Sequence, residues 1–303
     1  IKIYIIIIIY IVNIIKSSEK NKRALWVADF GIRHNYGGAQ RSDSILIDHG
    51  RALGWNILEY NYDVNPAILA DTNDIIVSAN LETLSRTNPQ LIDFIASHPR
   101  HFRVEHDSNR YLPQERRKVL FGSACRNFFL TNYHLSQFIS SYGDIFPNTA
   151  IVPDPIDVSM FKDTLKSRDN KVMYAGFMHD LKGTPAFIEY AMDNPQTSFV
   201  ATSWGHRIYE FVLKKLDNVE FYGKMPFSDM PNIYNSHAEM FYHPMFYEPF
   251  CRSVGEAILC GMQINGNDKI GCLHYLNEVG MDRFREECAN APSTFWSIVN
   301  ESL

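Results

Sequence analysis

The sequence predicts an α/β protein built from two Rossmann-like domains, each a parallel sheet covered by helices. Short apolar runs alternate with amphipathic segments along residues 24–152, which is typical of buried parallel strands and their connecting helices. The same alternation restarts at residue 171, after a segment that contains two prolines. A chain of 303 residues is long enough for two such domains.

In the first half of the chain, apolar runs predict strands, and two segments between them have helical periodicity. The strands are expected at residues 24–30, 55–60, 74–78, 101–107, 128–131 and 150–152. The helices are expected at residues 39–53 and 89–96. Gly54 follows the first helix directly and is expected to cap it.

The second half repeats this pattern. Strands are expected at residues 171–176, 197–202, 218–223 and 240–244, and helices at residues 184–192 and 230–236. Gly176 is expected to turn the chain at the end of the first of these strands. Pro153 and Pro155 stop regular structure between the halves. We therefore divide the chain into a leader at 1–22 and domains at 23–153 and 154–303.

The composition is that of an ordinary soluble protein. Hydrophobic residues make up 46% of the chain and charged residues 21%, and the formal net charge is −5. This balance gives no indication of a nucleic-acid partner. None of the five cysteines forms a Cys-x-x-Cys pair, which is typical of proteins in a reducing cytosol. We therefore expect a cytoplasmic protein.

The leader is unusual because residues 1–15, IKIYIIIIIYIVNII, are almost all isoleucine and tyrosine. This run is short for a membrane span, which needs about 20 residues, and it lacks the small-residue cleavage site of a signal peptide. One interpretation is translated upstream sequence or a miscalled start, since AT-rich codons encode these residue types. The alternative is a hydrophobic membrane anchor.

The most informative segment is 246–261, FYEPFCRSVGEAILCG. Glu248 lies in a loop, and Glu256 lies in the opening turns of an apolar helix that begins near Arg252 and that Gly261 could cap. The N-terminus of a helix offers free N–H groups and a positive dipole end, which suit a diphosphate. A lone glutamate there is usually an ordinary acidic helix start, but the whole string favours a ligand site.

This segment resembles the Glu-x7-Glu signature of GT-B glycosyltransferases of the retaining family 4 type. Three further segments resemble elements of the same family: GFMHDLKG at 176–183, IVPDPIDVSMF at 151–161 and GGAQR at 37–41. In the first of these the family has an arginine and a lysine that clamp the donor diphosphate. Lys182 matches the lysine, whereas Phe177 occupies the arginine position, so one expected cation is missing.

The resemblance implies a role for each matching residue. Those implied to be catalytic are Glu248, His106 and Lys182. Those implied to bind the donor are Glu256, Arg252, Gly176, Lys182, Phe250, Cys251 and Gly223. Those implied to lie near the acceptor are Gly37, Gly38 and Asp107. A histidine at a strand end is as often structural, and a glycine pair before a helix is most often a simple loop.

If the resemblance holds, the chain transfers a sugar from a nucleotide-diphosphate sugar to an acceptor hydroxyl with retention, without a metal ion or other cofactor. The acceptor would be a glycan, a lipid-linked sugar or a small molecule. Two alternatives remain open at this point. One is a catalytically degenerate scaffold that binds a nucleotide sugar or a glycan, and the other is a nucleotide-sugar epimerase.

A basic stretch in the first half has two interpretations. Its members are Arg100, Arg103, Arg110, Arg116, Arg117 and Lys118. They could form a surface for an anionic acceptor or a lipid headgroup, which would give peripheral membrane contact. They could instead form a solvated helix face, and Glu115 among them favours this second interpretation.

Overall fold

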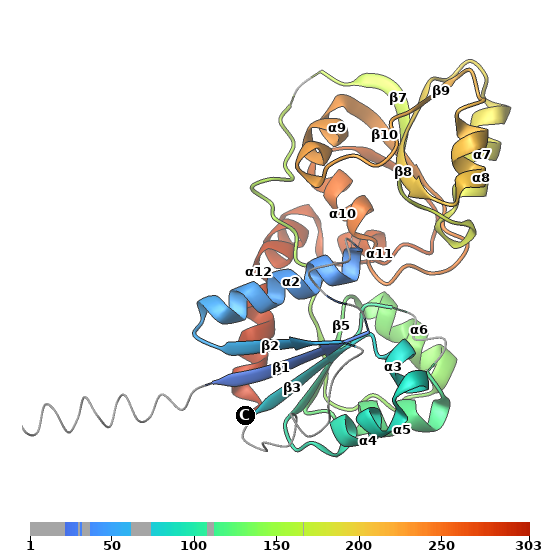
Figure 1. Ribbon diagram of the computed structural model, residues 1–303. Coiled ribbons are helices and arrows are strands. Elements are labelled where there is room, and N and C mark those ends of the chain that lie inside the picture. Colours follow the sequence, from blue (N-terminus) through green and yellow to red (C-terminus); the bar gives the residue numbers. More distant parts are fainter. Residues whose placement is uncertain (1–21, 30, 32–36, 62–73, 108–111, 166) are drawn as a thin grey trace, which may run out of the picture.

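The structure, a computed structural model, describes residues 22–29, 31, 37–61, 74–107, 112–165 and 167–303 (Figure 1). Within these ranges the chain forms two lobes, each with a parallel sheet. The six strands of the first sheet are ordered β2-β1-β3-β4-β5-β6, and the five of the second β11-β10-β7-β8-β9. Most of the leader, part of the loop before the first helix and Arg110 lie outside the described residues.

The first sheet contains strands β1 (Arg23–Ala28), β2 (Asn56–Tyr60), β3 (Ile75–Ala79), β4 (His101–Val104), β5 (Arg126–Phe129) and β6 (Thr149–Ile151). Its helices are α2 (Gly38–Ala52), α3 (Glu82–Thr87), α4 (Pro89–Ser97), α5 (Gln114–Ser123) and α6 (Asn132–Tyr142). The predicted strands and helices of this half are confirmed. Helix α4 begins where expected because Asn88 caps the N–H of Leu91 and Pro89 fills the first turn.

The second sheet contains strands β7 (Asp169–Met178), β8 (Phe199–Gly205), β9 (Val219–Phe221), β10 (His237–Tyr242) and β11 (Gln263–Gly266). Its helices are α7 (Thr184–Asp193), α8 (Arg207–Leu213), α9 (Met230–Ser236), α10 (Arg252–Leu259) and α11 (Gly271–Val279). Single 3₁₀ turns, η2 (Asp180–Lys182) and η3 (Phe227–Asp229), precede α7 and α9. The long helix α12 (Met281–Glu301) ends the chain.

Several expected strand ends differ from the observed ones by two or three residues, and for two of them the contacts show why. Strand β4 stops at Val104 rather than at residue 107, because side chains take over the backbone N–H groups beyond it: Asn80 Oδ1 accepts from the N–H of His106 at 3.3 Å. Strand β7 does not turn at Gly176 but continues to Met178, since β8 pairs with it as far as Gly205. Gly176 therefore sits inside a strand, at a φ of 153° that favours glycine.

Helix α12 connects the two lobes by packing back onto the first sheet (Figure 1). Phe295, Trp296 and Val299 are buried in one core with strand β1 and helix α2. The indole N–H of Trp296 donates to the carbonyl of Leu46 at 2.7 Å. The domain boundary between residues 153 and 154 stays a prediction. The end of α12 lies within the predicted domain 154–303 but is packed in the core of the first sheet.

Helices α3 to α6 cover the other face of the first sheet with a separate apolar core. The second lobe has its own core, to which Leu130 of the first lobe and Ile156 of the linker contribute. Among the described residues, no helix combines the length and apolar character needed to span a membrane.

Candidate functional site

The site is centred on the N-terminus of α10, which begins at Arg252 as the sequence predicts. Cys251 precedes it with a φ of 75°, a left-handed conformation that is uncommon for a residue with a Cβ. The preceding loop is anchored to the segment before α11. The N–H of Glu248 donates to the carbonyl of Lys269 at 2.7 Å, and the N–H of Gly271 to that of Glu248 at 2.9 Å. These contacts fix Glu248 just ahead of the helix.

Lys182 and Glu248 form an ion pair. The ammonium group of Lys182 donates to both carboxylate oxygens of Glu248, at 2.6 and 2.8 Å. Gly183 makes this approach possible, because a Cβ there would lie 2.1 Å from the carbonyl oxygen of His243 at the end of β10. Burial alone lowers the pKa of Lys182, but the Glu248 carboxylate outweighs it and raises the pKa overall. Two residues predicted to be catalytic are thus brought together, and the lysine is charged.

Arg252 is engaged on both sides of its guanidinium group. One nitrogen, Nη1, donates to the hydroxyl of Ser42 at 3.1 Å and to the carbonyl of Pro155 at 2.6 Å. The other, Nη2, lies 3.3 Å from Oε1 of Glu256. Burial raises the pKa of Glu256 above its ordinary value, against the opposing charges of Arg252 and Arg41. The two predicted donor ligands of α10 are therefore paired with each other, and Arg252 also connects the two lobes.

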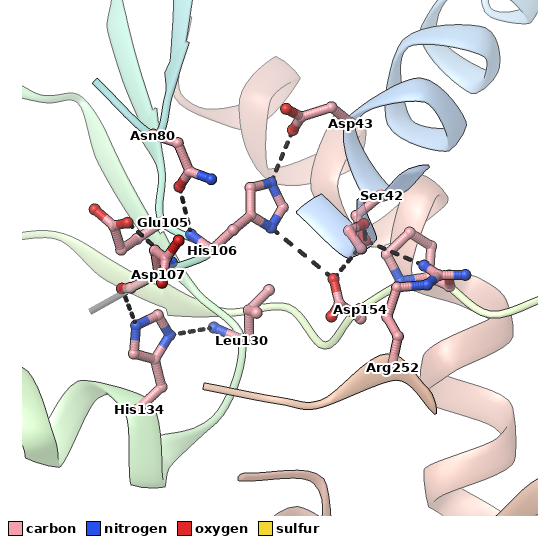
Figure 2. Close-up of polar contacts among 12 residues, drawn as sticks. Ser42, Asp43, Asn80, Glu105, His106, Asp107, Leu130, His134, Asp154 and Arg252 are labelled. Atoms are coloured by element: carbon pink, nitrogen blue, oxygen red, sulfur yellow. Dashed lines mark hydrogen bonds and ion pairs between the residues drawn. The ribbon is translucent and has the colours of Figure 1, made fainter. Parts of the chain in front are cut away.

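His106 follows β4 of the first lobe and lies between two carboxylates, one on α2 and one on the linker between the lobes (Figure 2). Its Nε2 is 2.8 Å from Oδ1 of Asp43, and its Nδ1 faces Oδ1 of Asp154 at 3.9 Å. Asp154 accepts a hydrogen bond of 2.6 Å from Ser42, the residue that also contacts Arg252. Burial alone would lower the pKa of His106, but these carboxylates raise it above its ordinary value. The ring therefore takes up a proton more readily than an ordinary histidine.

The turn that carries His106 is held from several elements (Figure 2). Glu105 accepts from the N–H of Asp107 at 3.1 Å and pairs with the buried Arg103 at 2.7 Å. His134 of α6 lies 3.1 Å from the carbonyl of Asp107 and accepts from the N–H of Leu130. Burial lowers the pKa of His134 to about 3, so its ring is neutral. The predicted acceptor residue Asp107 is thus fixed by its backbone.

The glycine pair before α2 also lies beside the site. A Cβ on Gly38 would meet the Arg252 side chain at 3.5 Å, so α2 and α10 approach closely here. Gly37 is the N-cap residue of α2. Four residues after Gly37, the guanidinium of Arg41 stacks over the ring of Phe227 at 3.3 Å, a second contact between the lobes.

Three other residues predicted to bind the donor have different surroundings. The phenyl ring of Phe250 is buried in the core and stacks on Phe284, so it has a packing role there. The Cys251 thiol is also buried, and this burial, with Glu248 nearby, raises its pKa to about 12. The carbonyl of Gly223 accepts from the N–H of Ser203 in β8 at 2.9 Å.

Phe177, in the position where the resemblance implies an arginine, belongs to an aromatic cluster. Its ring packs edge-to-face on Trp204, the residue opposite it in β8, with centroids 4.8 Å apart. Both rings are partly exposed, and Lys224 lies 4.7 Å from the centroid of Trp204. His179 and His206 complete the cluster. The position where the resemblance implies an arginine is thus part of an aromatic cluster at the ends of β7 and β8.

Three residues of the site were missed by the sequence analysis: Ser42, Asp43 and Asp154. Ser42 and Asp43 directly follow the GGAQR segment on α2, and Asp154 lies between the two prolines of the linker. Each was within or beside a segment already noted for its resemblance, which is the signal that could have found them. Among the residues that the structure describes, no group of three or more histidine, cysteine, aspartate or glutamate side chains could hold a metal ion.

No protein-family model and no curated protein matches the chain. Several solved structures are similar to the chain. HepE from Anabaena, in complex with UDP and glucose, is 14% identical with a TM-score of 0.64 over 92% of this chain and 98% of its own. Sucrose-phosphate synthase from Thermosynechococcus elongatus is 11% identical with a TM-score of 0.69, covering 92% and 97% of the two chains.

A glycosyltransferase from Rickettsia africae is 12% identical with a TM-score of 0.68, covering 93% of this chain and 99% of its own. Similarity at this level of identity concerns the fold. With its two parallel sheets and the junction between them, the chain has the GT-B fold, two Rossmann-like α/β domains, as the sequence predicts.

Proposed function

We propose that this protein is a retaining glycosyltransferase of the family 4 type, which moves a hexose from a nucleotide-diphosphate sugar to an acceptor hydroxyl without a metal ion or other cofactor. The observation that carries the proposal is the meeting of Lys182, Glu248 and the N-terminus of α10 at one point of a GT-B fold. A cation, a carboxylate and free helix N–H groups are what a charged sugar donor requires.

In the proposed reaction the bond between the anomeric carbon and the diphosphate oxygen breaks, the acceptor oxygen bonds to the same face of the sugar, and the acceptor's proton passes to the departing diphosphate oxygen. Negative charge then grows on the departing diphosphate. The Lys182 ammonium and the N–H groups that open α10 stabilise this charge from fixed positions. Glu248 accepts from sugar hydroxyls while keeping its contact with Lys182, and Glu256 accepts from the ribose.

Uridine is the first base to test, because HepE has been crystallised with UDP and with UDP-glucose. Thermal unfolding with UDP, GDP, ADP, CDP and dTDP measures binding without knowledge of the acceptor. A nucleotide at 100 times its dissociation constant stabilises a protein by about 2.7 kcal/mol, which is a shift of several degrees. We expect a shift with one nucleotide only.

Two substitutions show whether the shift reports the proposed site. Glu256→Gln, which keeps the size of the side chain, should lose the shift, whereas the same change at the exposed Glu189 of α7 should keep it. A shift that survives in Glu256→Gln would contradict the assigned ribose contact.

The second candidate function is a scaffold that binds a nucleotide sugar or glycan without transferring it. Phe177 in place of a cation favours this alternative, because the diphosphate then has one fewer positive charge to meet it. Sugar transfer, or hydrolysis of a UDP-sugar above the rate in the Lys182→Gln variant, would exclude it.

A further inference from the structure

One ring nitrogen of His106 is buried without a hydrogen bond to any residue that the structure describes. Among the described residues, no hydrogen-bond partner reaches Nδ1 of His106, although the side chain is only 3% exposed. A buried polar nitrogen without a partner is costly, so native structures rarely retain one without a reason. The nearest acceptor is Oδ1 of Asp154 at 3.9 Å, about one ångström beyond hydrogen-bond distance (Figure 2).

Asp154 is kept from His106 by a competing partner. The same Oδ1 accepts a short bond of 2.6 Å from the hydroxyl of Ser42. The Ser42 oxygen in turn accepts from the Arg252 guanidinium at 3.1 Å, and a hydroxyl that accepts from a cation is a stronger donor. Ser42 has another acceptor within reach, the carbonyl of Gly38 at 3.1 Å. The hydroxyl can therefore switch partners without losing a hydrogen bond.

We propose that Asp154 is a positioning residue that fixes the His106 ring and, through Ser42, ties its orientation to the state of Arg252 at the start of α10. A diphosphate at the N-terminus of α10 attracts the Arg252 guanidinium away from Ser42. The hydroxyl then turns to Gly38, and the released carboxylate bonds Nδ1. Only the response of Arg252 to a bound diphosphate rests on the proposed function.

The charges around His106 agree with this arrangement. The titratable groups that face it are Asp43 from α2, Asp154 from the linker, Glu105 from its own turn and His134 from α6. Burial alone would lower the pKa of His106, but the three carboxylates raise it overall. His134 does not titrate near neutral pH, because burial lowers its pKa to about 3. Changes in the titration of His106 therefore report its carboxylate neighbours.

The test is an NMR titration of the His106 ring, whose signal is identified by its absence from the His106→Gln variant. Without ligand, the midpoint in the unsubstituted protein should lie above the ordinary value of about 6.5. Asp154→Asn should lower it by about one pH unit, the usual effect of losing one nearby opposite charge. A midpoint unchanged in Asp154→Asn would overturn the positioning role.

Addition of UDP tests the connection to α10. Saturating UDP should raise the His106 midpoint in the unsubstituted protein, and this rise should be absent in Ser42→Ala, which cannot relay the change. An equal rise in both would mean that the charge of UDP acts directly, and would overturn the relay. If calorimetry shows that UDP does not bind, the proposed donor is wrong, whereas the titration of Asp154→Asn still decides the positioning role.

Asp157→Asn is the matched control. Asp157 is an exposed carboxylate on the same linker, and it caps the N–H groups of Ser159 and Met160 away from the network. This variant should keep both the midpoint of His106 and its response to UDP. A shift as large as that in Asp154→Asn would show that any charge on the linker acts on the ring, against a specific role for Asp154.

Discussion

Removal of the Arg252 side chain should strongly destabilise the protein, because its guanidinium group contacts both lobes. In Arg252→Met the contacts to Ser42 and Pro155, at 3.1 and 2.6 Å, are lost, and the buried Glu256 carboxylate loses its ion-pair partner at 3.3 Å. Breaking a buried pair from one side costs about 3–5 kcal/mol, because an uncompensated charge stays behind. For a chain of this size that is a fall in Tm of roughly 5–8 °C.

Thermal and urea unfolding of four proteins measures the effect: the unsubstituted chain, Arg252→Met, Glu256→Gln and the double variant. The double variant should recover at least about 1.5 kcal/mol of the expected sum, because a neutral amide needs no partner cation. Losses that simply add, or a loss below about 1 kcal/mol in Arg252→Met, would refute the argument that this pair supports the junction.

The pH dependence gives a second check on the same variant. Burial already raises the pKa of Glu256, and the guanidinium groups of Arg252 and Arg41 oppose that rise. Without Arg252 the folded-state pKa rises further above the unfolded value, so the folded variant gains protons, and hence stability, as the pH falls. The deficit of Arg252→Met should therefore shrink between about pH 7.5 and about pH 5.

Three further predictions concern separate parts of the molecule. Lys182→Gln should weaken UDP binding about 10–100-fold in calorimetry, since a hydrogen bond to a charged group contributes about 1.5–3 kcal/mol; unchanged affinity would contradict its place at the diphosphate. Gly50→Ala should cost about 1–3 kcal/mol in urea unfolding, because its Cβ would lie 2.3 Å from a ring carbon of Trp296, whereas Gly122→Ala, with nothing within 4 Å, should not destabilise. The raised pKa of His106 favours folding below its unfolded value of about 6.5, and this contribution should be lost as the pH rises through the folded pKa; His106→Gln should lack this part of the stability profile, and an identical profile would contradict the raised pKa.

Features set by local chemistry could be predicted from the sequence. Helix α10 begins at Arg252 and its chain turns at Gly261 with a φ of 79°, because a glycine there accepts a conformation that other residues resist. The limits of α9, Met230–Ser236, were also predicted correctly. Each of these features depends on residues within a few positions of one another.

Contacts between distant residues could not be predicted in the same way. Helix α12 was not among the elements predicted from the sequence, and a helical pattern does not tell which sheet covers a helix. Trp296 in fact packs on α2 and Trp55, in the core of the first sheet. Lys182 and Glu248 are 66 positions apart, and His106 and Asp43 are 63 apart, so no spacing rule relates them. The site residues could be proposed one by one, whereas their pairing depends on how the two lobes meet.

That pairing bears on the choice between transferase and scaffold. With Phe177 in the arginine position, the expected cations are Lys182 and Arg252, and each is already bonded to a carboxylate. A diphosphate therefore meets little net positive charge at long range and depends on the short-range N–H groups at the start of α10. Donor binding should consequently be modest and weakly sensitive to salt. When a diphosphate does bind, Lys182 reaches it while keeping a contact with Glu248, whose other oxygen then accepts from a sugar hydroxyl. The missing arginine should therefore weaken and slow the proposed transfer, but it leaves in place the groups that the reaction uses.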